Sequence, residues 1–110
     1  MAENREERLA LNEALFRTAN ERMARWEERH SDQDSELYHC ECADLGCRSK
    51  VPLSKADYER VRSDSTQFFV APGHEVPDIE TVIESHGEWS LIEKRPEVHE
   101  LVEATDPRQD

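Results

Sequence analysis

Apolar residues recur at three- and four-residue intervals through the first part of the chain, and this spacing predicts one long helix over residues 3–29. The segment lacks glycine and proline, and glutamate and arginine fill most of its other positions. One wide stripe along the helix gathers apolar side chains and one asparagine: Leu9, Asn12, Phe16, Ala19, Met23 and Trp26, joined by Leu11 and Leu15. We expect this stripe to pack on the rest of the domain. The alternative is pairing with a second copy or with a partner's helix, where Asn12 would fix the register.

The pattern becomes extended in the second half of the chain. Aromatic and β-branched residues predict a strand at 67–71, and two further strands at 79–84 and 88–94 flank a turn at 85–87. Alternating apolar and polar positions in these two strands are typical of half-buried strands. Shorter elements are expected before and after them: an extended piece at 51–53, a helix at 55–63 capped by Ser54, and a last helix at 97–104.

These elements predict an α+β fold with a long N-terminal helix, a cysteine-containing knuckle, a short helix and a small antiparallel sheet of about three strands. The expected organisation is an N-terminal helix at 1–30, a zinc-stapled domain at 31–104 and a disordered tail at 105–110. The polar residues at 30–36 lack periodicity and are expected to form a loop or linker.

Composition limits the size of the core. Only 35% of the 110 residues are hydrophobic whereas 36% are charged, and small cores are often supplemented by a bound metal. Three cysteines, an odd number, do not make a closed disulfide framework, and no apolar run approaches the roughly 20 residues that cross a bilayer. The charged N-terminus does not resemble a signal peptide. We therefore expect a cytoplasmic protein with free thiols and no contact with a membrane.

All three cysteines lie within eight residues, at Cys40, Cys42 and Cys47. Zinc prefers four sulfur or nitrogen ligands in a tetrahedron, and a C-x-C-x4-C turn can direct three sulfurs to one point. Gly46 offers the backbone freedom that such a turn requires. A competing interpretation is that the cysteines pack as small hydrophobic side chains without a metal. Their position in a polar, acidic stretch favours zinc.

The expected fourth ligand is His74, which follows a proline and a glycine in a turn between extended segments. In an extended chain, His39 would point away from its neighbour Cys40. A water molecule, or one of the other histidines, could complete the site instead: His30, His39, His86 or His99. If water completed it, zinc could be catalytic, and a carboxylate could act as its base: Glu41, Asp44 or Glu75.

Charge is distributed unevenly along the chain, which has a formal net charge of −12. The acidic balance argues against general affinity for nucleic acid and suits a basic protein surface as partner, or solubility alone. Basic residues nevertheless cluster directly after the knuckle, where they could contact phosphate: Arg48, Lys50, Lys55, Arg60 and Arg62. Contact with nucleic acid through this segment is therefore a second hypothesis.

Several motifs resemble a group of small, uncharacterised bacterial proteins. The run Phe16-Arg17 with Asn20-Glu21-Arg22 is similar to their FR-x-x-NER helix. The three cysteines match their CEC-x4-C knuckle, and Ala71-Pro72-Gly73-His74-Glu75 matches their APGHE turn. The resemblance implies that Cys40, Cys42, Cys47 and His74 form one site, and it implies no activity.

The function expected from the sequence is a cytoplasmic, non-enzymatic interaction or regulatory module with a structural zinc. Either its acidic surface or its N-terminal helix would bind a protein partner. The competing hypotheses are a regulator associated with nucleic acid through residues 48–62, and a zinc-dependent or thiol-redox enzyme or sensor.

Overall fold

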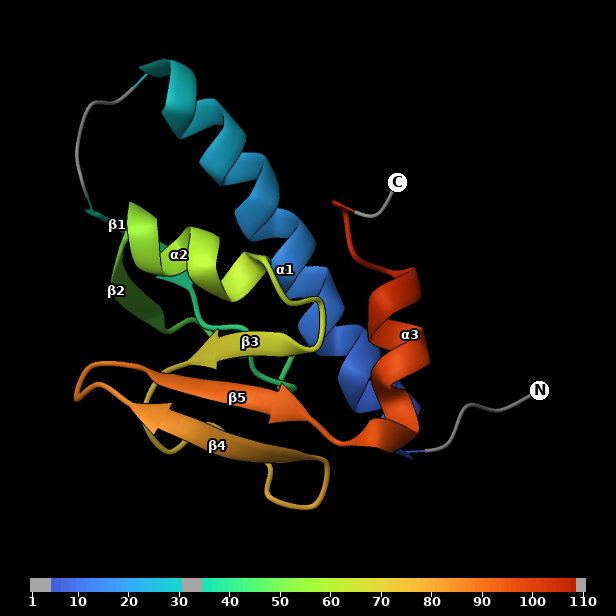
Figure 1. The fold of residues 1–110 in the computed structure, drawn as a ribbon. Coiled ribbons are helices and arrows are strands. Elements are labelled where there is room, and N and C mark those ends of the chain that lie inside the picture. Colours follow the sequence, from blue (N-terminus) through green and yellow to red (C-terminus); the bar gives the residue numbers. More distant parts are fainter. Residues whose placement is uncertain (1–4, 31–34, 109–110) are drawn as a thin grey trace.

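The computed structural model describes residues 5–30 and 35–108, and it has the α+β architecture that the sequence predicts (Figure 1). The predicted loop at 31–34 and the last two residues of the predicted tail lie outside the described residues. No helix in the described ranges has the length and apolar composition that crossing a bilayer requires. The helices are α1 (Arg5–His30), α2 (Lys55–Arg62) and α3 (His99–Ala104), the last preceded by the short 3-10 helix η1 (Pro96–Val98).

The strands form two antiparallel sheets. The first is a two-stranded ribbon of β1 (Ser35–His39) and β2 (Lys50–Ser54), and the cysteine knuckle, residues 40–47, lies in the loop between them. The second has the order β3-β5-β4 and consists of β3 (Gln67–Val70), β4 (Glu80–Ser85) and β5 (Ser90–Lys94). The three predicted strands of this sheet are confirmed within a few residues, as are the helices.

Local sequence signals account for most of these elements. The hydroxyl of Ser54 accepts a hydrogen bond of 3.0 Å from the backbone N–H of Asp57, which caps α2 as predicted. Strand β1 is the exception, because it begins at Ser35 inside the predicted loop. Its backbone is extended because it pairs with β2, for example Tyr38 with Val51. The local sequence of β1 does not predict this pairing.

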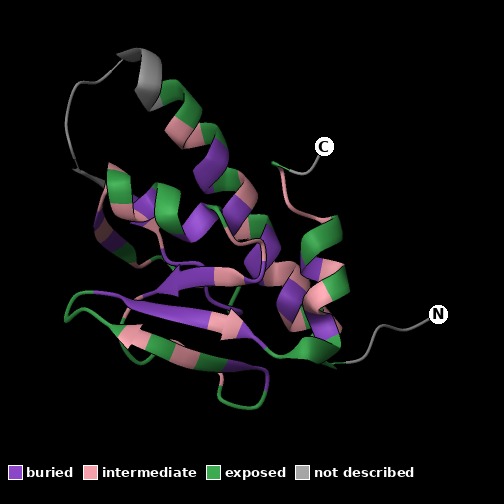
Figure 2. Cartoon of the chain, in the orientation of Figure 1, coloured by how far each residue is buried: buried purple, intermediate pink, exposed green. Residues whose placement is uncertain are grey.

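Both faces of the three-stranded sheet are covered (Figure 2). On one face, Phe68 and Ile92 join a cluster with Cys40, Cys42 and side chains of α1 and α3. On the other face, Phe69 and Leu91 join side chains of α2 and the β1-β2 ribbon. The half-buried pattern predicted for the hairpin is therefore right for β4 and wrong for β5, which is buried at four of its five residues.

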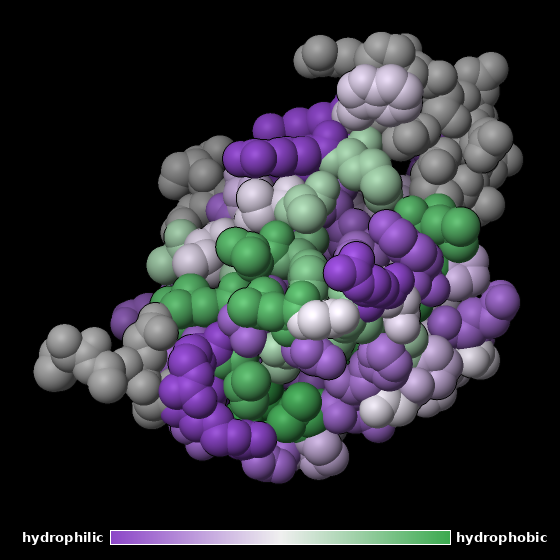
Figure 3. All heavy atoms as spheres, turned by 180° about the vertical axis from the view of Figure 1, so that it is seen from behind, coloured by the Kyte–Doolittle hydropathy of each residue, from purple (hydrophilic) through white to green (hydrophobic). Residues whose placement is uncertain are grey.

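The inward face of α1 differs from the predicted one. Its buried residues are Ala10, Glu13, Ala14, Arg17, Asn20 and Glu21, so polar side chains make up most of the contact. In the predicted stripe, Leu9, Asn12, Phe16 and Met23 are only half-buried, and Ala19 and Trp26 are exposed. Apolar side chains consequently reach the surface of the molecule (Figure 3).

The physical reason is that the polar side chains of α1 find buried partners. Arg17 donates hydrogen bonds of 2.7 Å to the carbonyl oxygens of Ser65 and Val102, and its guanidinium carbon lies 4.7 Å from the centre of the Phe68 ring. The carbonyl groups would otherwise lose hydrogen bonds to water without replacement. Sequence spacing alone cannot reveal these partners, which come from segments 48 and 85 residues away.

A second set of buried charges joins α1 to the sheet. Lys94 forms ion pairs with both Glu13 and Glu80, and all three side chains are inaccessible to solvent. Glu80 also accepts a hydrogen bond of 2.7 Å from the backbone N–H of Val76. Burial, followed by the charge of Glu80, raises the pKa of Glu13 well above its ordinary value. Glu13 therefore keeps its proton to a higher pH than an exposed glutamate.

The segment predicted as a disordered tail, residues 105–110, contacts the helices as far as Arg108. Its guanidinium binds the carboxylates of Glu21 on α1, at 2.6 Å, and of Glu59 on α2, at 2.8 Å. Thr105 caps the end of α3 by donating a hydrogen bond of 3.0 Å to the carbonyl oxygen of Leu101. The C-terminal segment is thus tied to both helices by charge rather than by apolar contacts.

Glu13→Gln tests the buried charges. A folded-state pKa above the unfolded value means that the folded protein binds more protons, so the free energy of unfolding falls as pH rises from about 4.3, the ordinary value for glutamate, through the folded pKa. Glutamine removes this dependence, and we expect the stability of the variant relative to wild type to increase with pH. Urea unfolding between about pH 5.5 and pH 8.5 measures the difference.

The control is Glu88→Gln, at an exposed position in the β4-β5 turn. Its stability should follow that of wild type across the pH range. Parallel curves for wild type and Glu13→Gln would contradict the raised pKa of Glu13.

Candidate metal centre

Four donor side chains converge at the knuckle. Sγ atoms of Cys40, Cys42 and Cys47 and a ring nitrogen of His74 all lie within 4.8 Å of one another. Nδ1 of His74 is 3.5 Å from Sγ of Cys40 and 3.6 Å from Sγ of Cys47. Cys40 and Cys42 are buried, whereas Cys47 and His74 are half-buried. The four residues predicted from the sequence are therefore brought together, and the cluster could hold a metal ion.

The distances fit a tetrahedral ion. With metal–sulfur bonds of about 2.3 Å and a metal–nitrogen bond of about 2.0–2.1 Å, a regular tetrahedron separates sulfur from nitrogen by about 3.5–3.6 Å. The two distances from His74 equal this separation. The chain alone thus provides the spacing that a Cys3His site needs, with Nδ1 as the histidine donor.

Backbone pairing places three of the donors. Strand β1 ends immediately before Cys40, whose N–H donates to the carbonyl oxygen of Ser49, 3.0 Å away across the ribbon. The N–H of Glu41 then donates to the carbonyl oxygen of Phe69 in β3 at 2.9 Å, which holds the knuckle against the three-stranded sheet. Cys47 is positioned by a tight turn in which its N–H donates to the carbonyl oxygen of Asp44.

The fourth donor comes from a turn that requires glycine. Gly73, directly before His74, has φ of 85°, a conformation that residues with a side chain rarely adopt. The N–H of His74 donates to the carbonyl oxygen of Ala71 at 3.0 Å and closes the turn. Gly46, in which the sequence suggests similar freedom, does not adopt a positive φ; its N–H instead donates to Oδ1 of Asp44 at 2.8 Å.

Backbone N–H groups also point at two of the sulfurs. The N–H of Ala71 is 3.1 Å from Sγ of Cys40, and the N–H of Ser49 is 3.5 Å from Sγ of Cys47. Such donors favour the thiolate over the thiol. Thiolates are the form of cysteine that binds a metal.

The cysteines titrate as a coupled set. The hydrogen bond from the Cys40 thiol lowers the pKa of Cys42 to about 5. The same hydrogen bond, together with burial, raises the pKa of Cys40. One sulfur therefore loses its proton readily, whereas the next proton is held by the accumulated negative charge. A bound cation would remove that penalty, because metal binding releases protons from its ligands.

The other histidines considered as ligands have different contacts. Both ring nitrogens of His39 face carbonyl oxygens, of Cys40 at 2.6 Å and of Cys47 at 2.9 Å. His86 contacts Glu84 at 2.7 Å and stacks on Trp89, and Nε2 of His99 is 2.7 Å from the carbonyl oxygen of Lys94. The side chain of His30 lies outside the described residues.

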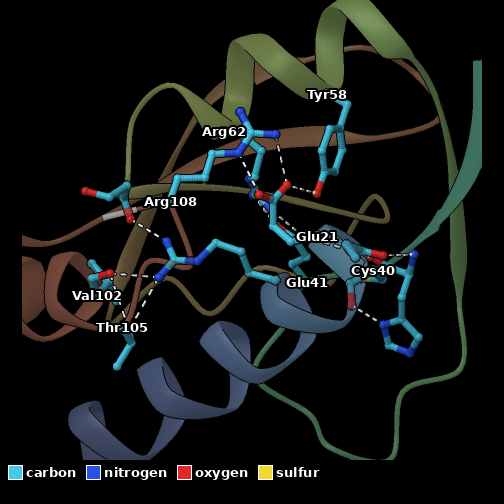
Figure 4. Close-up of polar contacts among 12 residues, drawn as sticks. Glu21, Cys40, Glu41, Tyr58, Arg62, Val102, Thr105 and Arg108 are labelled. Carbon is cyan, nitrogen blue, oxygen red and sulfur yellow. Dashed lines mark hydrogen bonds and ion pairs between the residues drawn. The ribbon is translucent and has the colours of Figure 1, made fainter. Parts of the chain in front are cut away.

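Glu41, between the first two cysteines, has a role that the sequence does not reveal. Its carboxylate accepts two hydrogen bonds of 2.6 Å from Arg62, and the side chains of both residues are almost wholly buried (Figure 4). Asn20 of α1 donates a further hydrogen bond of 2.8 Å to the same carboxylate. The bidentate pair therefore joins the knuckle to α2, and the hydrogen bond from Asn20 joins it to α1. The carboxylate of Glu41, one of the three suggested by the sequence as a catalytic base, is occupied by these contacts.

The basic residues predicted to contact phosphate do not form one patch. Arg62 is buried with Glu41, so its predicted phosphate contact is wrong. Arg60 binds Glu84 through two hydrogen bonds of 3.1 Å. Lys55 lines a separate hollow between α1, α2 and the C-terminal segment. Arg48 and Lys50 alone remain exposed beside the knuckle.

Comparison with known proteins adds no assignment, since no protein family, curated protein or solved structure matches the chain. What the molecule defines by itself is an α+β domain with a Cys3His cluster that could bind a metal ion.

Arg62→Met tests the anchoring of the knuckle. Removing one partner of a buried ion pair leaves the other charge uncompensated, so we expect the free energy of unfolding to fall by about 3–5 kcal/mol. Arg60→Met, in the same helix, breaks an exposed pair and should cost at most about 1 kcal/mol. Denaturant unfolding of both zinc-loaded variants measures the difference.

The double variant Glu41→Leu with Arg62→Met removes both charges and should be more stable than Arg62→Met alone. Equal losses for Arg62→Met and Arg60→Met would show that the buried pair does not anchor the knuckle.

Proposed function

We propose that the protein is a small interaction module whose cysteine knuckle is held in shape by a structural zinc ion. The observation that supports this most directly is the pair of distances from Nδ1 of His74 to two cysteine sulfurs, 3.5 and 3.6 Å, which suit a tetrahedral ion. Thiolate and imidazole ligands in a tetrahedron are the set that zinc takes most often.

The donor set supports a structural ion over a catalytic one. Three sulfurs and one nitrogen complete a tetrahedron, whereas catalytic zinc keeps a position for water or substrate. Of the carboxylates considered as a base, Glu41 is paired with Arg62, and Oδ1 of Asp44 accepts the N–H of Gly46. An interaction module therefore accounts for the site better than a zinc-dependent enzyme does.

The position of the cluster explains what a zinc ion would stabilise. It would join the end of β1, the knuckle loop and the turn after β3. Cys40 and Cys42 also belong to the core cluster beneath α1. Binding at this point would compensate for a core in which many of the inward side chains of α1 are charged.

A protein partner in a reducing compartment is the second part of the proposal. Free thiolates suit such a compartment, and the net charge of −12 opposes non-specific binding to nucleic acid. The nucleic-acid hypothesis has lost support, because Arg62 is buried and Arg60 is paired with Glu84. Pairing through α1 remains a prediction that oligomer mass can check.

Metal analysis tests the zinc proposal. We expect about one zinc per chain in the purified protein, and we expect a chelator to lower the melting temperature, because ligand bound only to the folded state at 1,000 times its Kd adds about 4 kcal/mol of stability. His74→Ala should lose zinc affinity and stability together. The matched control is His86→Ala, an exposed histidine outside the cluster, which should keep its zinc.

A metal-free protein with unchanged melting temperature would refute the structural role. Zinc retained by His74→Ala at wild-type affinity would refute the assignment of the fourth ligand.

A further inference from the structure

A groove of about 320 Å³ runs between α1 and the knuckle. It lies beside the cysteine cluster and shares Cys47 with it. The residues that line the groove come from α1, from the end of β1, from the knuckle and from the start of β2: Phe16, His39, Leu45, Gly46, Cys47, Arg48 and Lys50. The groove is therefore shaped by the same knuckle that a metal would stabilise.

The floor of the groove, as defined by Phe16 and Leu45, is apolar. The Phe16 ring stacks on His39 with 4.1 Å between ring centres, and His39 is itself fixed by the carbonyl oxygens of Cys40 and Cys47. Leu45 on the knuckle is 57% exposed, and Leu15 on α1, next to Phe16, is 62% exposed. A rigid aromatic surface beside exposed leucines is the usual setting for an apolar anchor residue of a partner.

The rim carries unbalanced positive charge. Arg48 and Lys50 are both exposed, and no acidic side chain among residues 5–26 and 37–108, the ranges in which side chains are described, forms an ion pair with either. Arg60 and Arg108 differ from these two cations, because Arg60 is paired with Glu84 and Arg108 with Glu21 and Glu59. On a protein with a net charge of −12, these two side chains mark a local site for carboxylates.

We propose that this groove binds an acidic segment of a partner protein, which inserts one aliphatic or aromatic side chain over Phe16 and places carboxylates against Arg48 and Lys50. The apolar floor distinguishes this partner from a nucleic-acid backbone, which would use the cations alone. The positive charge of the rim favours an acidic partner segment over a neutral apolar helix. The proposal rests on the proposed function only in requiring an intact knuckle.

Three fluorescein-labelled nonapeptides test the groove with the zinc-loaded full chain. The first has a central Leu-Phe pair flanked by aspartate and glutamate, the second replaces that pair with two serines, and the third replaces all acids with asparagine and glutamine. Fluorescence anisotropy should show binding of the first peptide, with a Kd at least about tenfold lower than for either control. Its affinity should weaken as salt is added.

Protein variants locate the binding. Arg48→Ala with Lys50→Ala should raise the Kd of the first peptide at least about tenfold, and Leu45→Ser should raise it about fivefold or more. Arg60→Ala with Arg95→Ala removes the same charge at exposed positions outside the groove and should change the Kd by less than about twofold. Zinc content and melting temperature are measured for every variant.

Equal binding of the three peptides, or no effect of the Arg48 and Lys50 substitutions, would overturn the proposal. Tighter binding of a single-stranded DNA 12-mer, lost in the same double variant, would assign the rim to phosphate instead. A concentration-dependent dimer that excludes the peptide would assign the groove to a second copy of the chain. Because zinc content is measured separately, the two proposals fail in different ways: a metal-free wild-type protein with unchanged melting temperature refutes the structural site, whereas a zinc-loaded protein that does not bind the first peptide refutes only the groove.

Discussion

The buried ion pair between Glu41 and Arg62 is the contact on which the rest of the structure depends. It fixes the middle of the C-x-C turn from the inside, so that Cys40 and Cys42 are held while their sulfurs face His74. Two parallel hydrogen bonds of 2.6 Å restrict the orientation of the carboxylate more than a single contact would. The third partner, Asn20, also bonds the backbone of His39, so α1, α2 and the knuckle meet at one polar point.

This arrangement shows how a chain with few apolar residues forms an interior. Arg17, Lys94 and Glu13 occupy positions in the core that leucine or isoleucine hold in more hydrophobic domains, and the partners of each come from other elements. Buried ion pairs add little net stability compared with apolar packing, but breaking one is costly. The network therefore specifies how α1 docks, and a metal at the knuckle would add the stability that the small core lacks.

The same docking explains why the knuckle has two distinct sides. Its inner side presents the cysteine sulfurs to His74, while its outer side borders the groove with Phe16, Leu45 and the cations of β2 and the loop before it. Because the polar face of α1 turns inward, Phe16 of its apolar stripe is left half-buried and lines this groove. A structural metal would hold the proposed binding surface in shape without taking part in binding.

The sequence by itself determined the helices, three of the strands and the four metal-binding candidates, because these follow from periodicity, capping, turn residues and the chemistry of cysteine and histidine. It favoured His74 over the other histidines, and the structure then placed the ring nitrogens of His39 against the carbonyl oxygens of Cys40 and Cys47. Only the tertiary structure decided which face of α1 is buried, that β1 is a strand, and that Arg62 binds Glu41 and not phosphate. Each of these depends on a partner distant in sequence. The sequence around a charged side chain is the same whether that side chain is solvated or paired with a buried side chain of opposite charge. Only the folded chain brings the second side chain into contact.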